Sequence, residues 1–596
     1  MCRIAGIISE KLSPDEIREN VAVMCNAMKH GGPDDNGIYA DEQAGIVLGH
    51  RRLSIIDLSD KGHQPMPDVG KRVWISFNGE IYNYRELKEE LIKTGAVFFS
   101  DTDTEVILAA YLQWGTRAFS RLRGMFAFAL YDADRSVTYL VRDSAGIKPL
   151  YYYATADGIV FASELKAFKA AGIATRSDSS WRVKFLAFGN IPEPYTTLAN
   201  VVSLAKGHTL SWCHKSSTYN LAPYGIASAT ANDYIEDANI AKNRINNAFK
   251  IAVSRQLISD ASIGVFLSGG IDSSLLSLVA SELHPYLQTV SIYFNEKQYD
   301  ERLYQKKVQS RLSGKCFTHL VQQQDFESFF PHFLSGMDLP TTDGINTWFI
   351  SKYAHDDGLK AVLSGLGADE LFGGYPSFNR IEYLKYLRRL PKFVLKGARY
   401  FKTDKYRKVS FLTHNNPLAD YLLLRGLFVP EDIARILDTD EEQVNRILFG
   451  DQVIEVLNSY NKEHAAWFET NLYLQNQLLR DTDVLSMAHG LEVRVPFLDE
   501  DFRQLVQNIS PDIRFNAYQP KKILLDSFSQ LLPEAIWKRP KMGFTFPLQE
   551  WMRTHSEISD KNLYKGEFAQ NLVKSFKEGR LHWSKIFALY QIQLND

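Results

Sequence analysis

Residues 263–283 read IGVFLSGGIDSSLLSLVASEL, and this stretch decides the fold of the C-terminal part of the chain. Ile263–Leu267 is a short apolar run typical of a buried strand. It leads into the glycine-rich turn Ser268-Gly269-Gly270, after which a helix is predicted over Ser273–Leu283. A strand predicted at Gln288–Phe294 follows, so strands alternate with helices and a parallel α/β sheet is predicted.

The turn after the first strand has the composition of an anion-binding loop. Glycine residues let the backbone approach an anion, the following helix N-terminus directs N–H groups at it, and serine residues add hydroxyl donors. Asp272 is a candidate ligand for Mg²⁺ held against the phosphates. No lysine closes the loop as in G-x-x-x-x-G-K-[ST], so a Walker-type NTPase is not predicted, and a plain glycine-rich turn is the alternative. The residues of this candidate phosphate-binding loop, besides Asp272, are Ser268, Gly269, Gly270, Ser273 and Ser274.

Before residue 210 the pattern differs, because many short strands are separated by turns. Helices are predicted near Asp15–Lys29 and Asp103–Trp114, and the mixture indicates an α+β sandwich. The dipeptide Asp157-Gly158 tolerates the positive φ of a tight turn and indicates a hairpin. The predicted strands are Val73–Phe77, Met125–Tyr131, Val137–Val141, Leu150–Ala154 and Ile159–Ala162.

The two patterns predict two domains, over residues 2–215 and 237–596, joined by a polar linker over residues 216–236. The second domain alternates strands and helices at first and then becomes mostly helical. Its further predicted elements are a helix over Asp237–Leu257, a strand at Ala361–Leu363 that feeds a second glycine-rich turn, and helices beyond Ser377.

The composition limits the class of protein. A chain of 596 residues is too long for one core, and 45% hydrophobic with 23% charged residues is ordinary for a globular protein. Lys and Arg number 68 against 70 Asp and Glu, so no broad basic nucleic-acid surface is expected. The four cysteines form no C-x-x-C pair, so we expect neither a zinc site nor a disulfide frame, and a cytoplasmic location fits best. No run of about 18 apolar residues predicts a membrane span.

Cys2 is a candidate nucleophile because it directly follows Met1. Its small side chain permits removal of the methionine, and the free α-amino group would titrate near ~7.7–8.0. That amine can accept the thiol proton directly or through a water, so one residue supplies both nucleophile and base. An incidental buried cysteine is the alternative.

Three other segments carry groups that such a nucleophile needs. Arg52 supplies a cation at the end of an apolar strand. Asn78-Gly79 places a side-chain amide beside a glycine N–H, as an oxyanion hole requires, although a hairpin turn is the alternative. Asp103 opens a helix where a carboxylate can take an ammonium ion, although plain helix capping is the alternative.

Together these segments resemble the glutaminase domain of the N-terminal-nucleophile amidotransferases, as in asparagine synthetase, over residues 2–210. The resemblance implies that Cys2 is the nucleophile and that Arg52 holds the α-carboxylate of glutamine. It also implies that Asn78 and Gly79 line the oxyanion hole, while Glu80 and Asp103 fix the amine end of the substrate.

The chain departs from this family twice near the nucleophile. A small residue, commonly Gly, usually follows the cysteine, whereas this chain has Arg3. The family usually reads His-Arg-Gly-Pro-Asp where residues 30–34 read HGGPD, so Gly31 replaces an arginine. We therefore expect a structural or inter-domain ion pair to be missing.

The loop at 268–274 resembles the pyrophosphate loop of ATP pyrophosphatases, and LSGLGADELFGGY at 363–375 resembles the synthetase domain of asparagine synthetases. The resemblance implies ATP and Mg²⁺ as the groups bound there. The expected fold is an α+β N-terminal-nucleophile sandwich (αββα) followed by an α/β ATP-pyrophosphatase domain with a parallel sheet and a helical C-terminal part. By this resemblance the adenosine is cradled by Leu267, Ile292, Ser364 and Gly365, Mg²⁺ is bound by Asp272 and Asp369, and Lys521 neutralises charge that develops during adenylation.

One departure concerns the acceptor. In bacterial asparagine synthetases a glutamate that helps to bind or activate aspartate stands at the position of Leu366. Leucine can neither accept a hydrogen bond nor receive an ammonium group. Either another acid such as Glu370 takes that task, or the acceptor is not aspartate.

The resemblance implies a glutamine-dependent amidotransferase that adenylates a carboxylate, with aspartate as the first expected acceptor. Relatives that amidate sugar uronic acids or peptide carboxylates are the alternatives that share this chemistry. A Cys2-only amidase, an ATP-dependent ligase with an inactive glutaminase domain, and a weakly catalytic assembly or regulatory protein are the alternatives of other classes. We expect small-molecule substrates, no nucleic acid, and, on family grounds, a homodimer.

Overall fold

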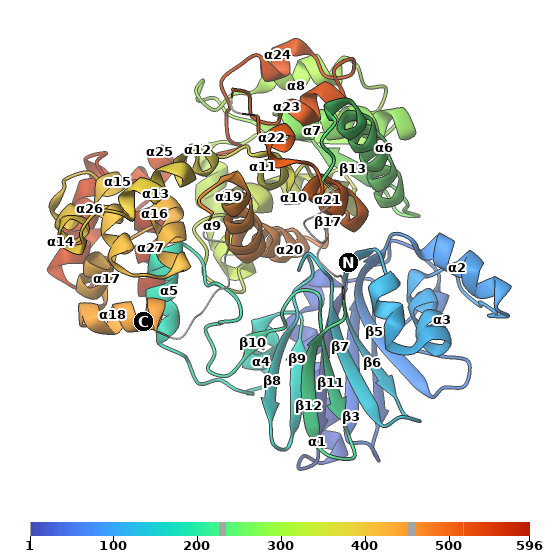
Figure 1. The fold of residues 1–596 in the computed structure, drawn as a ribbon. Coiled ribbons are helices and arrows are strands. Elements are labelled where there is room, and N and C mark those ends of the chain that lie inside the picture. The colour runs from blue at the N-terminus through green and yellow to red at the C-terminus, as the bar shows by residue number, and fades with distance from the viewer. Residues whose placement is uncertain (1, 226–233, 451–458, 517, 596) are drawn as a thin grey trace.

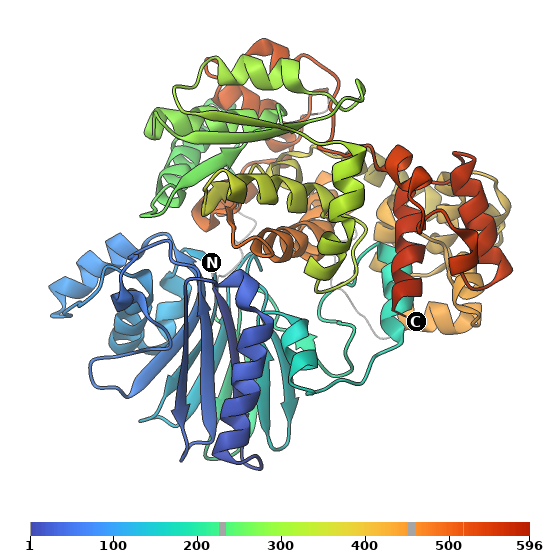
Figure 2. The same ribbon diagram turned by 180° about the vertical axis from the view of Figure 1, so that it is seen from behind.

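The computed structural model describes residues 2–225, 234–450, 459–516 and 518–595. Its N-terminal part is a pair of stacked antiparallel sheets, and its C-terminal part contains a parallel sheet and a separate group of helices (Figure 1). The view from behind shows the helix of residues 14–27 lying across the outer face of the first sheet (Figure 2). The expected order, an α+β sandwich before an α/β domain, is confirmed.

The first antiparallel sheet contains the central strand β1, which directly follows Cys2, the candidate nucleophile. Two helices cover its outer face, and the apolar side of α1 (Pro14–Ala27) packs on it through Ile17, Val21 and Met24. Ser13 caps this helix, because its hydroxyl accepts from the N–H of Glu16. In spatial order the strands are β10 (Val202–Ser203), β8 (Tyr151–Thr155), β9 (Gly158–Ala162), β1 (Arg3–Ser9), β3 (Ile46–Arg52) and β2 (Asp35–Asp41), and the second covering helix is α4 (Leu165–Ala170).

The second antiparallel sheet packs face to face with the first through an apolar layer that includes Ile4, Leu48 and Ala127. Two helices cover its other side, so the order of layers is αββα. In spatial order the strands are β12 (Thr218–Pro223), β11 (His208–Cys213), β7 (Val137–Arg142), β6 (Gly124–Asp132), β5 (Val73–Ile81) and β4 (Met66–Pro67), and the helices are α2 (Tyr84–Lys93) and α3 (Asp103–Trp114).

The strands, hairpin and helices predicted in this part are confirmed, but the start of the predicted linker is wrong. Residues 218–223 form β12, which pairs with β11 along the edge of the second sheet. Most of its side chains are exposed, as in a linker, but its backbone is hydrogen-bonded to β11. Residues 226–233 of the predicted linker lie outside the described residues.

The third sheet is parallel throughout and confirms the strands predicted at 263–267, 288–294 and 361–363. Its last strand, β17, was not expected, because three residues in a helical region give no periodic signal. In spatial order the strands are β15 (Cys316–Leu320), β14 (Gln288–Tyr293), β13 (Ile263–Phe266), β16 (Ala361–Leu363) and β17 (Glu492–Arg494). The accompanying helices are α6 (Ala238–Gln256), α7 (Ile271–Leu283), α8 (Arg302–Gln309), α9 (Gln323–Gly336), α10 (Ile345–Asp356) and α11 (Ala368–Phe372).

The chain beyond Ser377 is mostly helical, as predicted, and much of it forms a separate helical group on the left of Figure 1. In chain order the helices are α12 (Ser377–Arg380), α13 (Leu384–Leu387), α14 (Lys392–Gly397), α15 (Asp404–Arg407), α16 (Pro417–Arg425), α17 (Pro430–Leu437), α18 (Glu441–Phe449), α19 (Lys462–Phe468), α20 (Arg480–Met487), α21 (Glu500–Gln507), α22 (Pro511–Arg514), α23 (Lys522–Ser527), α24 (Glu534–Trp537), α25 (Leu548–Thr554), α26 (Glu567–Lys577) and α27 (Trp583–Leu594).

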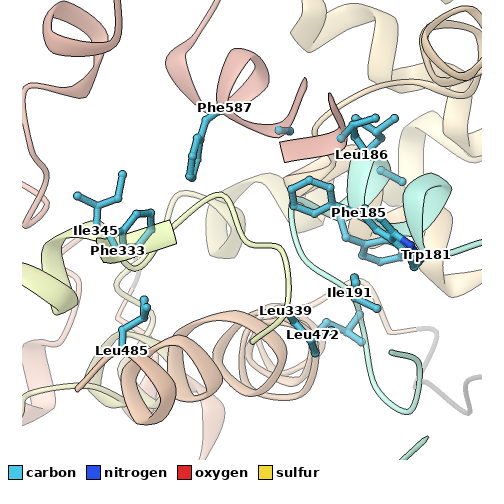
Figure 3. Close-up of a cluster of buried hydrophobic side chains, with 14 of the residues drawn as sticks. Trp181, Phe185, Leu186, Ile191, Phe333, Leu339, Ile345, Leu472, Leu485 and Phe587 are labelled. Atoms are coloured by element: carbon cyan, nitrogen blue, oxygen red, sulfur yellow. The ribbon is translucent and has the colours of Figure 1, made fainter. Parts of the chain in front are cut away.

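A helix from the N-terminal part is built into this helical group. Trp181, Phe185 and Leu186 of α5 (Ser180–Phe188) are buried beside Leu339, Leu472 and other apolar side chains of the C-terminal part (Figure 3). The carbonyl oxygen of Ala187 accepts a 2.7 Å hydrogen bond from the N–H of Leu427. The two parts of the chain therefore share a core. Among the described residues, none of the helices combines the length and the apolar character that crossing a bilayer requires.

Candidate active sites

The candidate nucleophile is buried at the start of β1. The backbone nitrogen of Cys2 donates to Oδ1 of Asn78 at 3.2 Å, and its Sγ lies 4.0 Å from the carbonyl oxygen of Leu53. Burial raises the pKa of the Cys2 thiol, because a thiolate is poorly solvated there. A nearby base is therefore needed before the sulfur can attack, and the α-amino group that removal of Met1 would expose on Cys2 is the candidate.

Asn78 and Gly79 lie next to this sulfur on β5. The Nδ2 of Asn78 is buried without a hydrogen-bond partner in the described residues, which is expensive unless a ligand accepts from it. Gly79 has φ +153°, and a Cβ there would lie 2.1 Å from the carbonyl oxygen of Met125. Only glycine fits this close approach. The free amide beside the nucleophile has the chemistry of an oxyanion hole.

The other residues predicted for glutamine line the same small pocket as Cys2 and Gly79, namely Arg52, Glu80 and Asp103. Arg52 donates to the carbonyl oxygen of Ser59 at 2.9 Å. Burial raises the pKa of Asp103 to about 7, although its carboxylate accepts a 2.8 Å bond from the N–H of Ile81. Burial also raises the pKa of Glu80. Two carboxyls that are costly to ionise would each gain from an ammonium ligand.

Arg494, which was not predicted from the sequence, contacts one of these acids from the C-terminal part of the chain. The guanidinium of Arg494, on β17 of the parallel sheet, lies 3.5 Å from Glu80 and 2.5 Å from Glu492. Arg494 is fully buried and also donates to the carbonyl oxygens of Gln256 and Ile258. No local sequence pattern links Arg494 to Glu80, which lies some 400 positions earlier in the chain.

The expected loss of an inter-domain ion pair at Gly31 is wrong, because Arg3 makes that pair. The Arg3 guanidinium is fully buried, 2.5 Å from Glu164 and 2.9 Å from Asp483 on α20. Lys148 also contacts Asp483, at 3.0 Å. A Cβ on Gly31 would lie 2.8 Å from Cγ of Arg3, so the Arg3 side chain occupies the space beside position 31. The two departures from the family are therefore one compensated exchange.

A second and larger cavity, of about 410 Å³, opens at the carboxyl ends of β13 and β16. This is the edge of a parallel sheet at which ligands usually bind. Its wall includes ten residues predicted from the sequence: Ser268, Gly270, Asp272, Ser273, Ser364, Gly365, Leu366, Asp369, Glu370 and Lys521. It also includes residues without a sequence prediction of their own, such as Asp343, Asn346, Thr347 and Asp481.

Four other residues predicted for ATP do not line the cavity. The side chains of Leu267 and Ile292 are buried in apolar cores beside the sheet. Ser274 is fully buried on α7, and Gly269 lies at the turn, where its carbonyl oxygen accepts from Arg539 at 2.9 Å. The buried hydroxyl of Ser274 has no hydrogen-bond partner among the described residues, and the roles of these four residues stay predictions.

Lys521 joins the two predicted metal ligands. Its ammonium lies 2.5 Å from a carboxylate oxygen of Asp272 and also contacts Asp369. Burial alone would lower the pKa of Lys521, but the two carboxylates raise it, so the side chain is charged. Lys541 contacts Asp369 as well, at 2.7 Å. Two carboxylates at a phosphate-binding turn are hard oxygen donors, so the donor set fits Mg²⁺.

The predicted acceptor residues lie in the same cavity. Leu366 presents an apolar side chain, and Glu370 is almost fully buried. Burial raises the pKa of Glu370 to about 8, and its carboxyl accepts a 2.9 Å bond from the hydroxyl of Tyr375. Burial also raises the pKa of Asp481 to about 7. Burial therefore favours the protonated, uncharged form of both acids, more strongly for Glu370 than for Asp481.

An apolar cluster lies between the two sites. Leu53 of the N-terminal part belongs to this cluster and also lines the small pocket beside Cys2. Leu366 and Leu478 of the C-terminal part pack against the cluster and line the larger cavity. The cluster is continuous across the domain interface. The members that are buried are Leu53, Ile55, Tyr82, Met125, Ala145, Ile147, Ala361, Leu474, Leu479, Met487, Val495 and Leu498.

Comparison with known proteins gives matches along both parts. Residues 1–224 match the glutamine amidotransferase domain family, and residues 244–585 match the asparagine synthase family. Glutamine-hydrolyzing asparagine synthetase 1 of Bacillus subtilis (strain 168) is 31% identical, covering 94% of this chain and 90% of its own length. Asparagine synthetase 3 of the same organism is 28% identical, covering 95% and 91%. A solved glutamine phosphoribosylpyrophosphate amidotransferase from B. subtilis has 14% identity and a TM-score of 0.30, covering 54% of this chain and 81% of its own.

Proposed function

Because the chain belongs to the glutamine-hydrolysing asparagine synthetase family, we propose that it transfers the amide nitrogen of glutamine to the side-chain carboxylate of aspartate. The chain is a glutamine-dependent ligase, and ATP-dependent amidation is its class of reaction. Aspartate as the acceptor, Mg²⁺ and the roles of individual residues belong to the proposal. So does the division into two domains, with the first extended through β12 to residue 223 and the second over residues 237–596.

In the glutaminase half, Cys2 attacks the side-chain amide carbon of glutamine. Its thiol proton passes to the α-amino group that removal of Met1 exposes, at the nitrogen that lies 3.2 Å from Asn78. The amide nitrogen then takes a proton and leaves as ammonia, and water hydrolyses the thioester to glutamate. Nδ2 of Asn78 stabilises the oxyanion at each step.

The polar ends of glutamine are held by charge. Arg52 binds the α-carboxylate, and Glu80 and Asp103 bind the α-ammonium group. Arg494 keeps Glu80 in place from the parallel sheet, so the glutamine site is complete only when both domains are packed together.

In the synthetase half, a carboxylate oxygen of the acceptor attacks the α-phosphorus of ATP, pyrophosphate leaves, and an acyl adenylate remains. The turn at 268–274 holds the phosphates, and Lys521 neutralises the charge that develops on them. Asp272 and Asp369 would hold Mg²⁺, which supplies further charge neutralisation. Ammonia from the first site displaces AMP, with loss of a proton. The apolar cluster between the sites supports transfer away from water.

The observation that carries this proposal is the pairing, in one chain, of a nucleophile beside a free amide donor with a cavity in which a buried lysine joins two carboxylates. The decisive test measures pyrophosphate release with ATP, Mg²⁺ and ammonia. Aspartate is compared with a panel of uronic acids and peptides. Aspartate should be the best acceptor, and no release with any member of the panel would contradict the whole proposal.

Leu366 favours a second candidate acceptor. Its apolar side chain lies where the family's glutamate is expected, and Glu370 is held by Tyr375. An acceptor without an α-ammonium group, such as a uronic acid, would need no carboxylate at that point. If a uronic acid releases pyrophosphate and aspartate does not, the aspartate assignment is wrong and the amidotransferase class stands.

The role of Cys2 has its own test. Cys2→Ala should abolish glutamine-driven product formation and leave ammonia-driven formation nearly unchanged, because only the first half-reaction uses the sulfur. Both rates are followed as pyrophosphate release. An equal loss of the two rates would show that Cys2 acts structurally, and retention of both would revive an ATP-dependent ligase with an inactive glutaminase domain.

A further inference from the structure

A short segment of the helical group carries an unusual charge. Residues 380–408 contain eleven Lys and Arg residues against Glu382 and Asp404, although the whole chain has 68 basic and 70 acidic residues. The segment spans α12 to α15 and lies at the outer edge of the molecule, on the side away from the N-terminal sheets (Figure 1). The basic residues are Arg380, Lys385, Arg388, Arg389, Lys392, Lys396, Arg399, Lys402, Lys405, Arg407 and Lys408.

The same segment exposes large aromatic side chains. Tyr400 is 80% exposed and Phe393 is 76% exposed, values that leave nearly the whole ring in solvent. Single exposed apolar residues are normal on a protein surface, but a group of them on one short segment marks an interaction site. The exposed aromatic and aliphatic residues are Tyr383, Tyr386, Leu390, Phe393, Val394, Tyr400, Phe401 and Tyr406.

Internal contacts fix which side of the segment faces outward. Leu384, Leu395 and Ala398 are buried in or beside the helical core, so the residues between them point away from it. Three arginines are used internally, because Arg388 pairs with Asp420, Arg399 with Glu441 and Arg407 with Asp432. The cations left exposed are Arg380, Lys385, Arg389, Lys392, Lys396, Lys402 and Lys405.

We propose that this basic aromatic surface, residues 380–406, docks the protein on an anionic lipid membrane. Aromatic rings favour the boundary between headgroups and acyl chains, and lysine stems lie along apolar surface while the ammonium reaches lipid phosphates. Phe393 and Val394 lie on α14, directly after Pro391, and their exposed apolar side chains can enter this boundary. The surface docks on the bilayer and does not span it.

Charge and exposed apolar residues together favour an anionic membrane over a second copy of the chain and over nucleic acid. A second copy of the chain would bring seven exposed cations against seven more, which repel each other. Lysine and arginine both neutralise nucleic-acid phosphates, so the apolar residues of the surface decide between nucleic acid and lipid. The exposed aliphatic residues Leu390 and Val394 have no role on a phosphate backbone but contribute at a lipid boundary.

The test is flotation of the full chain with vesicles of phosphatidylcholine alone or mixed with phosphatidylglycerol. Binding should need phosphatidylglycerol and should weaken with salt. Each lysine near an anionic surface strengthens binding roughly fivefold, so the triple variant Lys392→Gln, Lys396→Gln, Lys402→Gln should lose about a hundredfold. Phe393→Ser with Tyr400→Ser should lose roughly a hundredfold through lost apolar burial.

A matched control carries Lys93→Gln, Lys306→Gln, Lys307→Gln, Phe99→Ser and Tyr286→Ser, at five residues that are exposed outside the helical group. It should bind vesicles as the parent chain does, and all variants should keep the parent melting temperature and its pyrophosphate release in solution. Absence of vesicle binding overturns the proposal, and so does binding that both surface variants retain. Equal or tighter binding to single-stranded RNA, or a dimer that only the surface variants abolish, would also overturn it.

Discussion

At the scale of single residues, Arg3 and Gly31 explain each other. Arg3 is buried between Glu164 and Asp483, and glycine at 31 leaves it room. We predict that Arg3→Gly destabilises the protein by about 3 kcal/mol, because Glu164 and Asp483 each lose one buried cation, although Lys166 and Lys148 still contact them. Urea unfolding measures this loss. Glutamine-driven synthesis should fall more than ammonia-driven synthesis, since Arg3 directly follows Cys2.

The exchange can be tested in the reverse direction. Gly31→Arg alone should also destabilise, because its Cβ would lie 2.8 Å from Cγ of Arg3. The double variant, with glycine at 3 and arginine at 31, should recover most of the stability. The arginine at 31 can then occupy the space that the Arg3 side chain has left and reach the same carboxylates. Strict additivity of the two losses would refute the idea that these positions compensate for each other.

Asp103 predicts how glutamine use depends on pH. Its pKa is raised to about 7, so the carboxyl is protonated below that pH and loses its charge. An uncharged carboxyl cannot balance the ammonium group of glutamine, so the KM for glutamine should rise roughly fivefold between about pH 7 and about pH 6. As the pH rises through 7, the KM should fall and then level off.

Steady-state glutaminase assays across this range separate KM from kcat. The α-amino group of Cys2 acts in the chemical step and should alter kcat instead. Asp103→Asn should bind glutamine weakly at every pH and lose the inflection in KM. An inflection that persists unchanged in this variant would assign it to another group.

At the scale of secondary-structure elements, local sequence patterns predicted many central helices and strands but not the strands β12 and β17 at the edges of two sheets. The helix predicted near Asp103–Trp114 is α3 with the same bounds, and Asp157-Gly158 predicted the hairpin of β8 and β9. Two of the strands that were not predicted lack a clear sequence pattern. Strand β12 is an exposed edge strand, and β17 is only three residues long. Their pairing depends on neighbours that are distant in sequence.

Helix α5 carries a prediction at this scale. Phe185 is fully buried between the N-terminal and C-terminal parts (Figure 3). Phe185→Ala should destabilise the protein by about 3–5 kcal/mol, because it leaves a cavity in a shared core. Urea unfolding followed by tryptophan fluorescence measures it, and Phe99→Ala, at a side chain 61% exposed, is the control with a change under about 0.5 kcal/mol. Equal effects of the two changes would mean that α5 adds nothing to the interface.

At the scale of the whole molecule, sequence reasoning named many of the residues that line the two pockets but not the contacts that join the two parts of the chain. Cys2, Asn78 and Asp103 belong to recognisable local patterns, as do Asp272 and Asp369. The contacts of Arg494 with Glu80 and of Arg3 with Asp483 join residues that are hundreds of positions apart. Such contacts are set by the packing of one domain on the other, and a single sequence contains no periodic signal for them.

The apolar cluster between the sites gives the last prediction. Ala145 is a small residue within it, 9% exposed, next to the tight turn that Asp143 holds by accepting from the N–H of Ala145 at 3.0 Å. Ala145→Phe should overpack the interface at a cost of about 1–3 kcal/mol and separate the two domains locally. Ammonia formed at Cys2 would then escape into water. Glutamate should therefore form in excess over pyrophosphate, whereas tight transfer gives one of each.

The assay measures both products in the same reaction, with free ammonia followed separately. Ala156→Phe is the matched control, because Ala156 is exposed at the hairpin of β8 and β9, far from the cluster in the fold. That variant should keep equal yields of glutamate and pyrophosphate. If Ala145→Phe also keeps equal yields while its stability falls as expected, nitrogen does not travel through this interface, because a passage there could not remain sealed when its wall is displaced.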